Sequence, residues 1–178
     1  MPIYFIRHGQ SEFNATFEGT IDPMIFDARL TPLGLAQAVE ARDKALELKI
    51  ARVITSPLTR AIQTAKTIFD GIAPIEVRHG HHELLKYSGD VGRHPEELQA
   101  DFPDLFFDHL PHRWWHADDV ADLEVPKEPV PIFQKRVAEF VTSLNEVDDE
   151  PVAIVGHGNA FQEIIGFMLN NCQMHQYR

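Results

Sequence analysis

Short apolar runs alternate with longer amphipathic segments along most of this 178-residue chain. The runs are continuous and contain many β-branched residues, which is typical of strands that are buried on both faces of a sheet. They are Ile3–Ile6, Ala51–Thr55, Ile75–Val77 and Val152–Val155. Each run is short enough to be a strand rather than a helix, so the pattern predicts a sheet built from these four segments.

Between the runs, apolar residues recur with the period of a helix. Thr31 followed by Pro32 is a helix-start signal, and this helix is expected to extend to about Leu48. By the same signal, Ser56 is interpreted as the N-cap of the next helix and Pro57 as its first residue. Two later helices are expected with the apolar faces Phe133, Val137, Phe140, Val141 and Leu144, and Phe161, Ile164, Ile165, Met168 and Leu169. No strand is assigned beyond them.

Residues 79–130 interrupt the alternation and are rich in Pro, His, Asp and aromatic residues. This stretch is too short for a core of its own, so it is interpreted as an insertion over the functional site. We therefore expect one domain spanning residues 1–178, of the α/β class. Its architecture is expected to be a three-layer αβα arrangement, with a mostly parallel sheet, helices on both faces and an inserted lid-like segment.

Two of the predicted strands end in a histidine beside glycine. The first runs into Arg7-His8-Gly9, and the last into Gly156-His157-Gly158. Open α/β sheets bind ligands at the carboxyl ends of their strands, so these side chains are expected at one site. Arg60 joins them from the first turn of the helix that follows the second strand. Two guanidinium groups and two imidazoles suit a phosphate, because the planar guanidinium forms paired hydrogen bonds with its oxygens.

The formal net charge of −11 changes the expected partners. It disfavours nucleic acid and anionic membranes, so a phosphate site must be a local positive region such as Arg7 and Arg60 would create.

The single cysteine, Cys172, excludes an intramolecular disulfide and agrees with a reducing compartment. The first residues do not have the pattern of a signal peptide, and no window approaches the roughly 20 apolar residues of a membrane span. A cytoplasmic protein is expected.

Four separated blocks occur in an order and spacing that resemble the histidine phosphatase superfamily, the phosphoglycerate-mutase-like proteins. The blocks are Ile6–Ser11 with Asn14, Leu30–Gly34 with Gln37–Ala38, Ser56–Ala61 with Thr64–Ala65, and Gly156–Gly158. The resemblance covers nearly the whole chain. Within the insertion, Gly89–Gly92, Phe102-Pro103 and Trp114-Trp115 are similar to a subgroup of fungal and plant mutase-like proteins.

The resemblance implies a phosphatase that works through a phosphohistidine on His8, without a metal or another cofactor. Arg7, Arg60 and His157 would then bind the non-bridging oxygens of the phosphate. In the same motif, Asn14 would donate to the phosphate, and Gly9 and Gln10 would contribute to substrate binding. The implied substrate is a small-molecule phosphomonoester.

A carboxyl group must protonate the leaving oxygen and later activate water. The resemblance favours Glu83 for this role by its position after the third strand. Many relatives carry a Glu-Gly pair downstream, where this chain has Asp90-Val91-Gly92. Asp90 therefore remains an alternative to Glu83 at this stage.

Other interpretations remain open from the residues alone. The protein could be a phosphoglycerate-mutase-type phosphomutase, a protein phosphohistidine or phosphotyrosine phosphatase, or a binding module with an inactive site. His79, His81 and His82 invite a metal site, but their spacing favours solvent-exposed histidines instead. Trp114-Trp115, with nearby phenylalanines, could line a lid, although anchoring of the insertion is favoured.

Overall fold

The computed structural model describes residues 2–117, 125–146 and 150–178. The helices and strands, in chain order, are β1 (Ile3–Arg7), α1 (Glu12–Thr16), α2 (Pro32–Glu47), β2 (Arg52–Thr55), α3 (Thr59–Phe69), β3 (Ile75–Val77), α4 (Pro95–Asp101), α5 (Val130–Ser143), β4 (Val152–Gly156), α6 (Gly158–Ile165) and β5 (Met174–Gln176). Two 3₁₀ turns cover Ser88–Asp90 and Leu144–Glu146. Among the described residues, no helix is long and apolar enough to cross a lipid bilayer.

The strands form one sheet in the order β3-β2-β4-β1-β5. Every neighbouring pair is parallel except β1 and β5, which are antiparallel. The mostly parallel sheet is therefore confirmed, and the four predicted strands are its first four members. β5 was not predicted because its three residues, Met174–Gln176, are only partly buried and form no apolar run. Its place in the sheet comes from pairing with β1.

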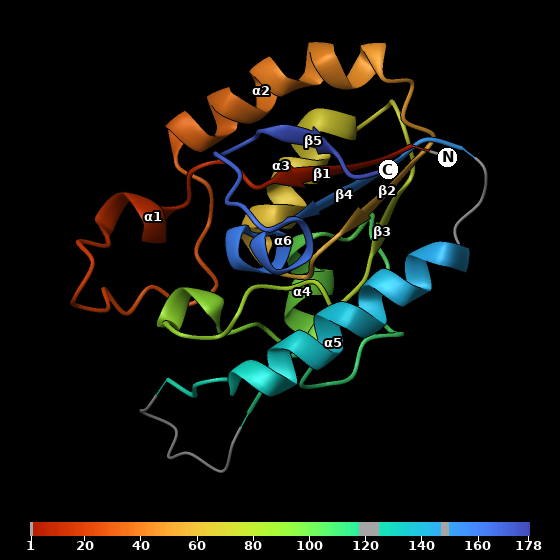
Figure 1. Cartoon of the computed structure of the whole chain (residues 1–178). Coiled ribbons are helices and arrows are strands. Elements are labelled where there is room, and N and C mark those ends of the chain that lie inside the picture. The colour runs from red at the N-terminus through yellow and green to blue at the C-terminus, as the bar shows by residue number, and fades with distance from the viewer. Residues whose placement is uncertain (1, 118–124, 147–149) are drawn as a thin grey trace.

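Helices cover both faces of the sheet, which confirms the three-layer αβα arrangement (Figure 1). On one face, α2 and α3 pack on the sheet through small and apolar side chains: Ala38, Ala45, Ala61, Ala65, Ile68 and Phe69. On the other face, α5 and α6 contribute Phe140 and Phe161 to a core with Phe5 and Ile154. The rings of Phe5 and Phe161 stack with their centroids 4.6 Å apart.

Two helix boundaries differ from the prediction. The N-cap of α3 is Leu58, so Ser56 and Pro57 lie outside the helix, although Arg60 is still in its first turn. Helix α6 ends at Ile165 because Gly166 adopts the left-handed conformation, with φ of 85°. As a consequence Met168 is exposed, contrary to the inward position predicted for it.

The insertion packs on α3 rather than forming a core of its own. Phe107, Trp114 and Trp115 are buried in a cluster that includes Leu58 and Ile62 at the start of α3. The aromatic pair therefore anchors the insertion, as the favoured interpretation expected. The insertion also contains α4, which the sequence pattern did not reveal. Residues 118–124 of the insertion lie outside the described residues.

Helix α2 approaches the segment after β1 unusually closely, and glycine makes this possible. A Cβ atom added to Gly34 would lie 2.1 Å from the carbonyl oxygen of Gln10, and one added to Gly9 would lie 2.4 Å from that of Gly34. Backbone atoms on both sides cannot move independently of the strand and the helix. This contact holds the His8–Gln10 turn against α2.

We expect Gly34→Ala to destabilise the protein by about 1–3 kcal/mol, because the new methyl group would force the helix away from the Gln10 carbonyl. In an ordinary helix interior the same change would stabilise by about 1 kcal/mol. Urea unfolding monitored by circular dichroism measures the difference. Val39→Ala, on the exposed face of α2, is the control and should change stability by no more than about 0.5 kcal/mol. A stabilising Gly34→Ala would contradict the close approach.

Candidate active site

The register of three parallel strands brings their carboxyl ends together. Arg7 of β1 pairs with Gly156 of β4, and Thr55 of β2 pairs with Val155. The backbone amide of His8 donates to the carbonyl of Gly156 at 3.0 Å, which continues the ladder by one residue. The residues after these strands therefore leave the sheet at the same edge, as the sequence predicted.

A hollow of about 220 Å³ lies at this edge. It is lined by Arg7, His8, Ser11, Phe13, Asn14, Arg60, Glu83, Leu84, Lys86, Tyr87, Asp90 and Asn159. Five of the predicted site residues, Arg7, His8, Asn14, Arg60 and Glu83, are among them. The alternative carboxyl group, Asp90, is there as well. His157 lies directly behind, with its ring centroid 5.2 Å from that of His8.

His8 is held as a neutral imidazole with a defined tautomer. Its Nδ1 is 2.7 Å from the carbonyl oxygen of Gly9, which can only accept, so Nδ1 carries the proton. Its Nε2 accepts from Nε of Arg60 at 3.2 Å, so Nε2 of His8 is unprotonated and carries a lone pair. Burial, followed by the charges of Arg60 and Arg7, holds the pKa of His8 well below its usual value. His8 can therefore act as a nucleophile at neutral pH.

Arg60 joins His8 to the insertion. Besides its bond to His8, its guanidinium donates to the Gly89 carbonyl and, at 3.1 Å, to Oδ1 of Asp90. Arg60 is 4% exposed, so this ion pair is formed away from bulk water. The arginine lies where it can contact both His8 and an anion bound in the hollow.

His157 and Arg7 each present a polar atom without a partner. Nε2 of His157 bonds to the hydroxyl of Ser56 at 2.7 Å, whereas its Nδ1 is buried and unpaired among the described residues. Arg7 donates from Nη1 to the Leu169 carbonyl at 2.6 Å, and its buried Nε has no partner there either. Burial, and then the charge of Arg60, holds the pKa of His157 well below its usual value. Buried polar atoms without a partner are rare unless a ligand satisfies them.

Two carboxyl groups line the hollow in different surroundings. The carboxylate of Glu83 lies against the start of α6 and accepts from the amides of Leu84 and Asn159 at 3.0 and 3.1 Å. Asp90 bonds to Arg60 through Oδ1 and accepts two backbone amides of the preceding turn, those of Lys86 and Tyr87, through Oδ2. Burial raises the pKa of Asp90 to about 6; the charge of Arg60 opposes this shift, and that of Glu83 adds to it.

Gly9 and Gln10 do not line the hollow, so the structure gives no support to a direct role for them in substrate binding. The amide of Gly9 donates to the Thr64 hydroxyl at 3.1 Å, and its carbonyl bonds to His8. The Gln10 side chain accepts from the hydroxyl of Thr31 at 2.8 Å. Both residues support the turn that carries His8.

Several site residues were missed in the sequence. Asn159 donates its amide to Glu83, and its position one residue after Gly158 at a helix start could have indicated this. Ser56 was interpreted as a helix cap, but its hydroxyl orients His157, 101 positions away. Lys86 and Tyr87 line the hollow without any local motif that marks them.

The histidines of the insertion are not all exposed as predicted. His79 is exposed, but His81 and His82 are buried. His81 stacks on Phe140 and contacts the Val155 carbonyl through Nε2 at 3.2 Å. Within the described residues, no three His, Cys, Asp or Glu side chains are grouped to hold a metal ion. Burial lowers the pKa of His81 to about 3, so it belongs to a neutral imidazole layer behind the site.

Comparisons with known proteins connect this site to one family. A sequence profile described as the histidine phosphatase superfamily (branch 1) matches residues 3–178. The chain is 38% identical to phosphoglycerate mutase-like protein 1 of Arabidopsis thaliana, in an alignment covering 96% of this chain and 72% of the relative. It is 28% identical to a 2,3-bisphosphoglycerate-dependent phosphoglycerate mutase of Neisseria gonorrhoeae, with coverages of 92% and 83%.

The fold is shared with solved structures at lower sequence identity. One is a phosphoserine phosphatase of Entamoeba histolytica in complex with 3-phosphoglyceric acid. It superposes with a TM-score of 0.63 at 22% identity, covering 97% of this chain and 88% of that one. This likeness shows the same architecture.

Buried neutral histidines predict acid sensitivity. The folded-state pKa of His81 is about 3 and that of an exposed histidine about 6.5, so below pH 6.5 the unfolded chain binds more protons. Stability is therefore present above pH 6.5 and falls as pH decreases, by up to about 1.4 kcal/mol per pH unit for each such group. Between pH 6 and 4.5, His81→Phe should lower the slope of the unfolding free energy against pH by about 1.4 kcal/mol per pH unit, which corresponds to one proton.

Urea unfolding at several pH values measures this slope. The exposed His112, replaced by glutamine, is the matched control and should leave the slope unchanged. An unchanged slope for His81→Phe would contradict the neutral state of His81.

Proposed function

Because the chain belongs to the histidine phosphatase superfamily, we propose that it hydrolyses a phosphomonoester of a small metabolite through a phosphohistidine on His8. The observation that carries the proposal is the state of His8. Its Nδ1 proton is committed to Gly9, and its unprotonated Nε2 accepts from Nε of Arg60; a bound phosphate would draw this donor away and free the lone pair for attack. A neutral, oriented imidazole next to fixed cations is the requirement for attack on a phosphate.

The surrounding cations and donors suit the anion. We assign the non-bridging oxygens to Arg7, Arg60 and His157, since the donor Arg7 Nε and the ring nitrogen His157 Nδ1 are buried and have no partner among the described residues. Asn14, which lines the hollow, adds a neutral donor. Arg7 and Arg60 supply the positive charge that a metal ion supplies in other phosphoryl-transfer enzymes, so the reaction is proposed to be metal-independent.

The reaction is proposed to proceed in two steps. Nε2 of His8 attacks phosphorus, the ester P–O bond breaks, and the leaving oxygen takes a proton from a carboxyl group. Water then attacks phosphorus, gives its proton to the same carboxylate, and the P–N bond breaks to release inorganic phosphate. Negative charge on the bound phosphate favours the protonated form of a neighbouring carboxyl group.

We assign the proton transfer to Glu83 and the anchoring of Arg60 to Asp90. Both oxygens of Asp90 are engaged, by Arg60 on one side and by two turn amides on the other. Both oxygens of Glu83 are engaged as well, but among the described residues they accept from the backbone amides of Leu84 and Asn159 and not from a cation. Arg136 of α5 donates to the Glu83 carbonyl at 2.9 Å. Its backbone is thus fixed while its carboxyl group faces the hollow.

A phosphomutase is the second candidate, since relatives carry that name. A mutase must bind a second anionic group during turnover, which calls for further cations around the site. Among the described lining residues, Lys86 is the one cation beyond Arg7 and Arg60. The small volume of the hollow also favours a small metabolite over a phosphorylated protein. With a net charge of −11, nucleic acid is not a proposed partner. We propose a cytoplasmic metabolite as the substrate.

Replacement of the nucleophile tests the proposed function. We expect His8→Ala to reduce phosphate release from the best substrate in a panel of phosphorylated metabolites by at least about a thousandfold. It should also abolish the acid-labile phosphoryl label on the protein. His112→Ala, at an exposed position, is the matched control. Comparable hydrolysis by His8→Ala would refute the assignment, and isomerisation of 3-phosphoglycerate faster than its hydrolysis would favour the mutase.

The choice of proton donor has its own test. A good leaving group such as p-nitrophenolate needs no proton, whereas an alkoxide does. Glu83→Gln should therefore lower kcat/KM for alkyl phosphates by about 10²–10⁴-fold and kcat/KM for p-nitrophenyl phosphate much less, because kcat/KM reports phosphoryl transfer to His8 and not the later attack of water. Asp90→Asn should lower kcat/KM for both substrates by a similar factor, because Asp90 acts through Arg60. The reverse pattern would exchange the two roles.

A further inference from the structure

Helix α3, which carries Arg60, begins without a cap of its own. Its N-cap residue is Leu58, which has no polar side chain, and the first amides of a helix need an external acceptor. The acceptor comes from another part of the chain. Oδ1 of Asp27 accepts from the Thr59 amide at 2.8 Å, and Oδ2 accepts from the Thr59 hydroxyl. Asp27 therefore fixes the residue immediately before Arg60.

Asp27 is held in an uncommon backbone conformation. Its φ of 41° lies in the left-handed region, which non-glycine residues rarely adopt unless surrounding contacts require it. The residue is 5% exposed, so its carboxylate needs partners inside the protein. Strain of this kind occurs preferentially at functional sites.

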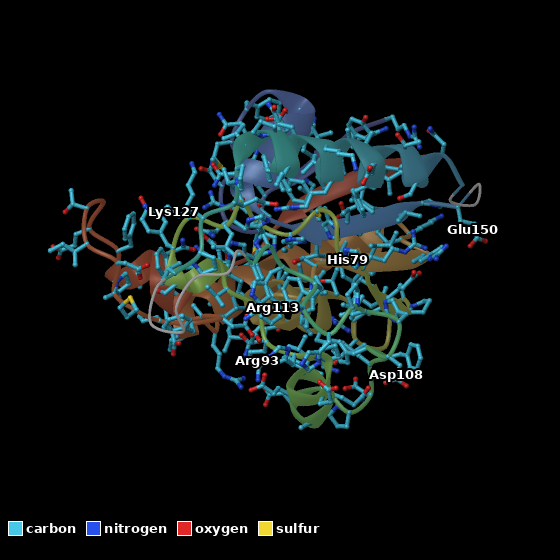
Figure 2. The ribbon with its side chains drawn as sticks, turned by 90° about the horizontal axis from the view of Figure 1, so that it is seen from below. His79, Arg93, Asp108, Arg113, Lys127 and Glu150 are labelled. Atoms are coloured by element: carbon cyan, nitrogen blue, oxygen red, sulfur yellow. The ribbon has the colours of Figure 1, made fainter. Side chains whose placement is uncertain are left out.

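The insertion supplies the opposite charge. Nε of Arg93 donates to Oδ2 of Asp27 at 2.7 Å, and Nη2 donates to the Thr59 hydroxyl at 2.7 Å and to Asp101 of α4 at 2.9 Å. Figure 2 shows Arg93 beside the ribbon of α4. Trp114 also holds the Arg93 carbonyl at 2.9 Å. The insertion thus reaches the start of α3 through Arg93 and Asp27.

The first turn of α3 is tied to the nucleophile on its other side. The hydroxyl of Thr64 donates to the Arg60 carbonyl at 2.7 Å and accepts from the Gly9 amide at 3.1 Å. A second tie joins the loop that contains Asp27 to the turn that carries Asp90, because Asp22 accepts from the Ser88 amide at 2.7 Å. The loop before α2 therefore supports both Arg60 and its partner.

From these contacts we infer that Asp27 is a positioning residue for the phosphate site, which it serves through Arg60, and that Arg93 makes this positioning depend on the docked insertion. The inference rests on the function proposed above. Without the Asp27 cap, the start of α3 can shift, and the Arg60 guanidinium is no longer aligned with Nε2 of His8 and the anion.

The test measures inorganic phosphate binding by titration calorimetry in two backgrounds. In the otherwise native chain, Asp27→Ala should weaken phosphate binding by about tenfold or more, because the aligned guanidinium is lost. In an Arg60→Ala background, the same change should alter binding by less than about twofold. Asp27→Asn should lose less, since its amide oxygen can still accept from Thr59.

Asp104→Asn is the matched control. Asp104 pairs with Lys66, so it also joins the insertion to α3, but near the helix end remote from Arg60. We expect phosphate binding and kcat/KM of this variant to match those of the native chain. Where Asp27→Ala fails to fold by circular dichroism, Asp27→Asn and Arg93→Gln are compared in the same two backgrounds.

The outcomes separate this inference from the proposed function. Equal losses of phosphate affinity with and without Arg60 would show that Asp27 acts on general stability and would overturn the positioning role. An unchanged affinity in Asp27→Ala would do the same. If the native chain binds phosphate but turns over no phosphoester, the proposed hydrolysis fails, while the comparison of the two backgrounds still decides the role of Asp27.

Discussion

The parallel pairing of β1 with β4 is the contact on which the candidate site depends. Arg7 lies opposite Gly156, so the residues that follow, His8 and His157, leave the sheet side by side. A shift of the register by one residue would turn these side chains to the opposite faces. The buried cores on both sides of the sheet oppose such a shift, because it would move Phe5 and Ile154 into the core on the opposite face, which is already filled by other side chains.

The electrostatics of the site follow from burial. In a protein with net charge −11, Arg7 and Arg60 form a local positive region at the hollow. Burial and the charge of Arg60 lower the pKa of both His8 and His157, and Arg7 adds to the shift of His8, so both imidazoles are neutral. Asp90 balances Arg60 without reaching His8. Burial thus serves both packing and reactivity.

The insertion contributes to the site in two ways. Residues between Glu83 and Asp90 line the hollow, whereas the aromatic residues further along anchor the segment on α3. Between these parts, Arg93 connects the insertion to Asp27. Only the residues that line the hollow fit the description of a lid. The aromatic residues and Arg93 instead support α3, the helix that carries Arg60.

By itself, the sequence determined four of the five strands, the layer arrangement and the positions of Arg7, His8, Arg60 and Glu83 at one edge. These features depend on apolar periodicity and on motifs whose residues are close in the chain. Asn14 was also placed correctly through its motif.

Only the tertiary structure decided the start of α3, the strand β5 and the burial of His81. The Ser56 hydroxyl bonds to His157 and the helix cap comes from Asp27, so a local capping signal was misleading. β5 has no apolar run and exists through its pairing with β1. In each case the deciding partner is far away along the chain, and such contacts form only when the segments have been brought together by folding.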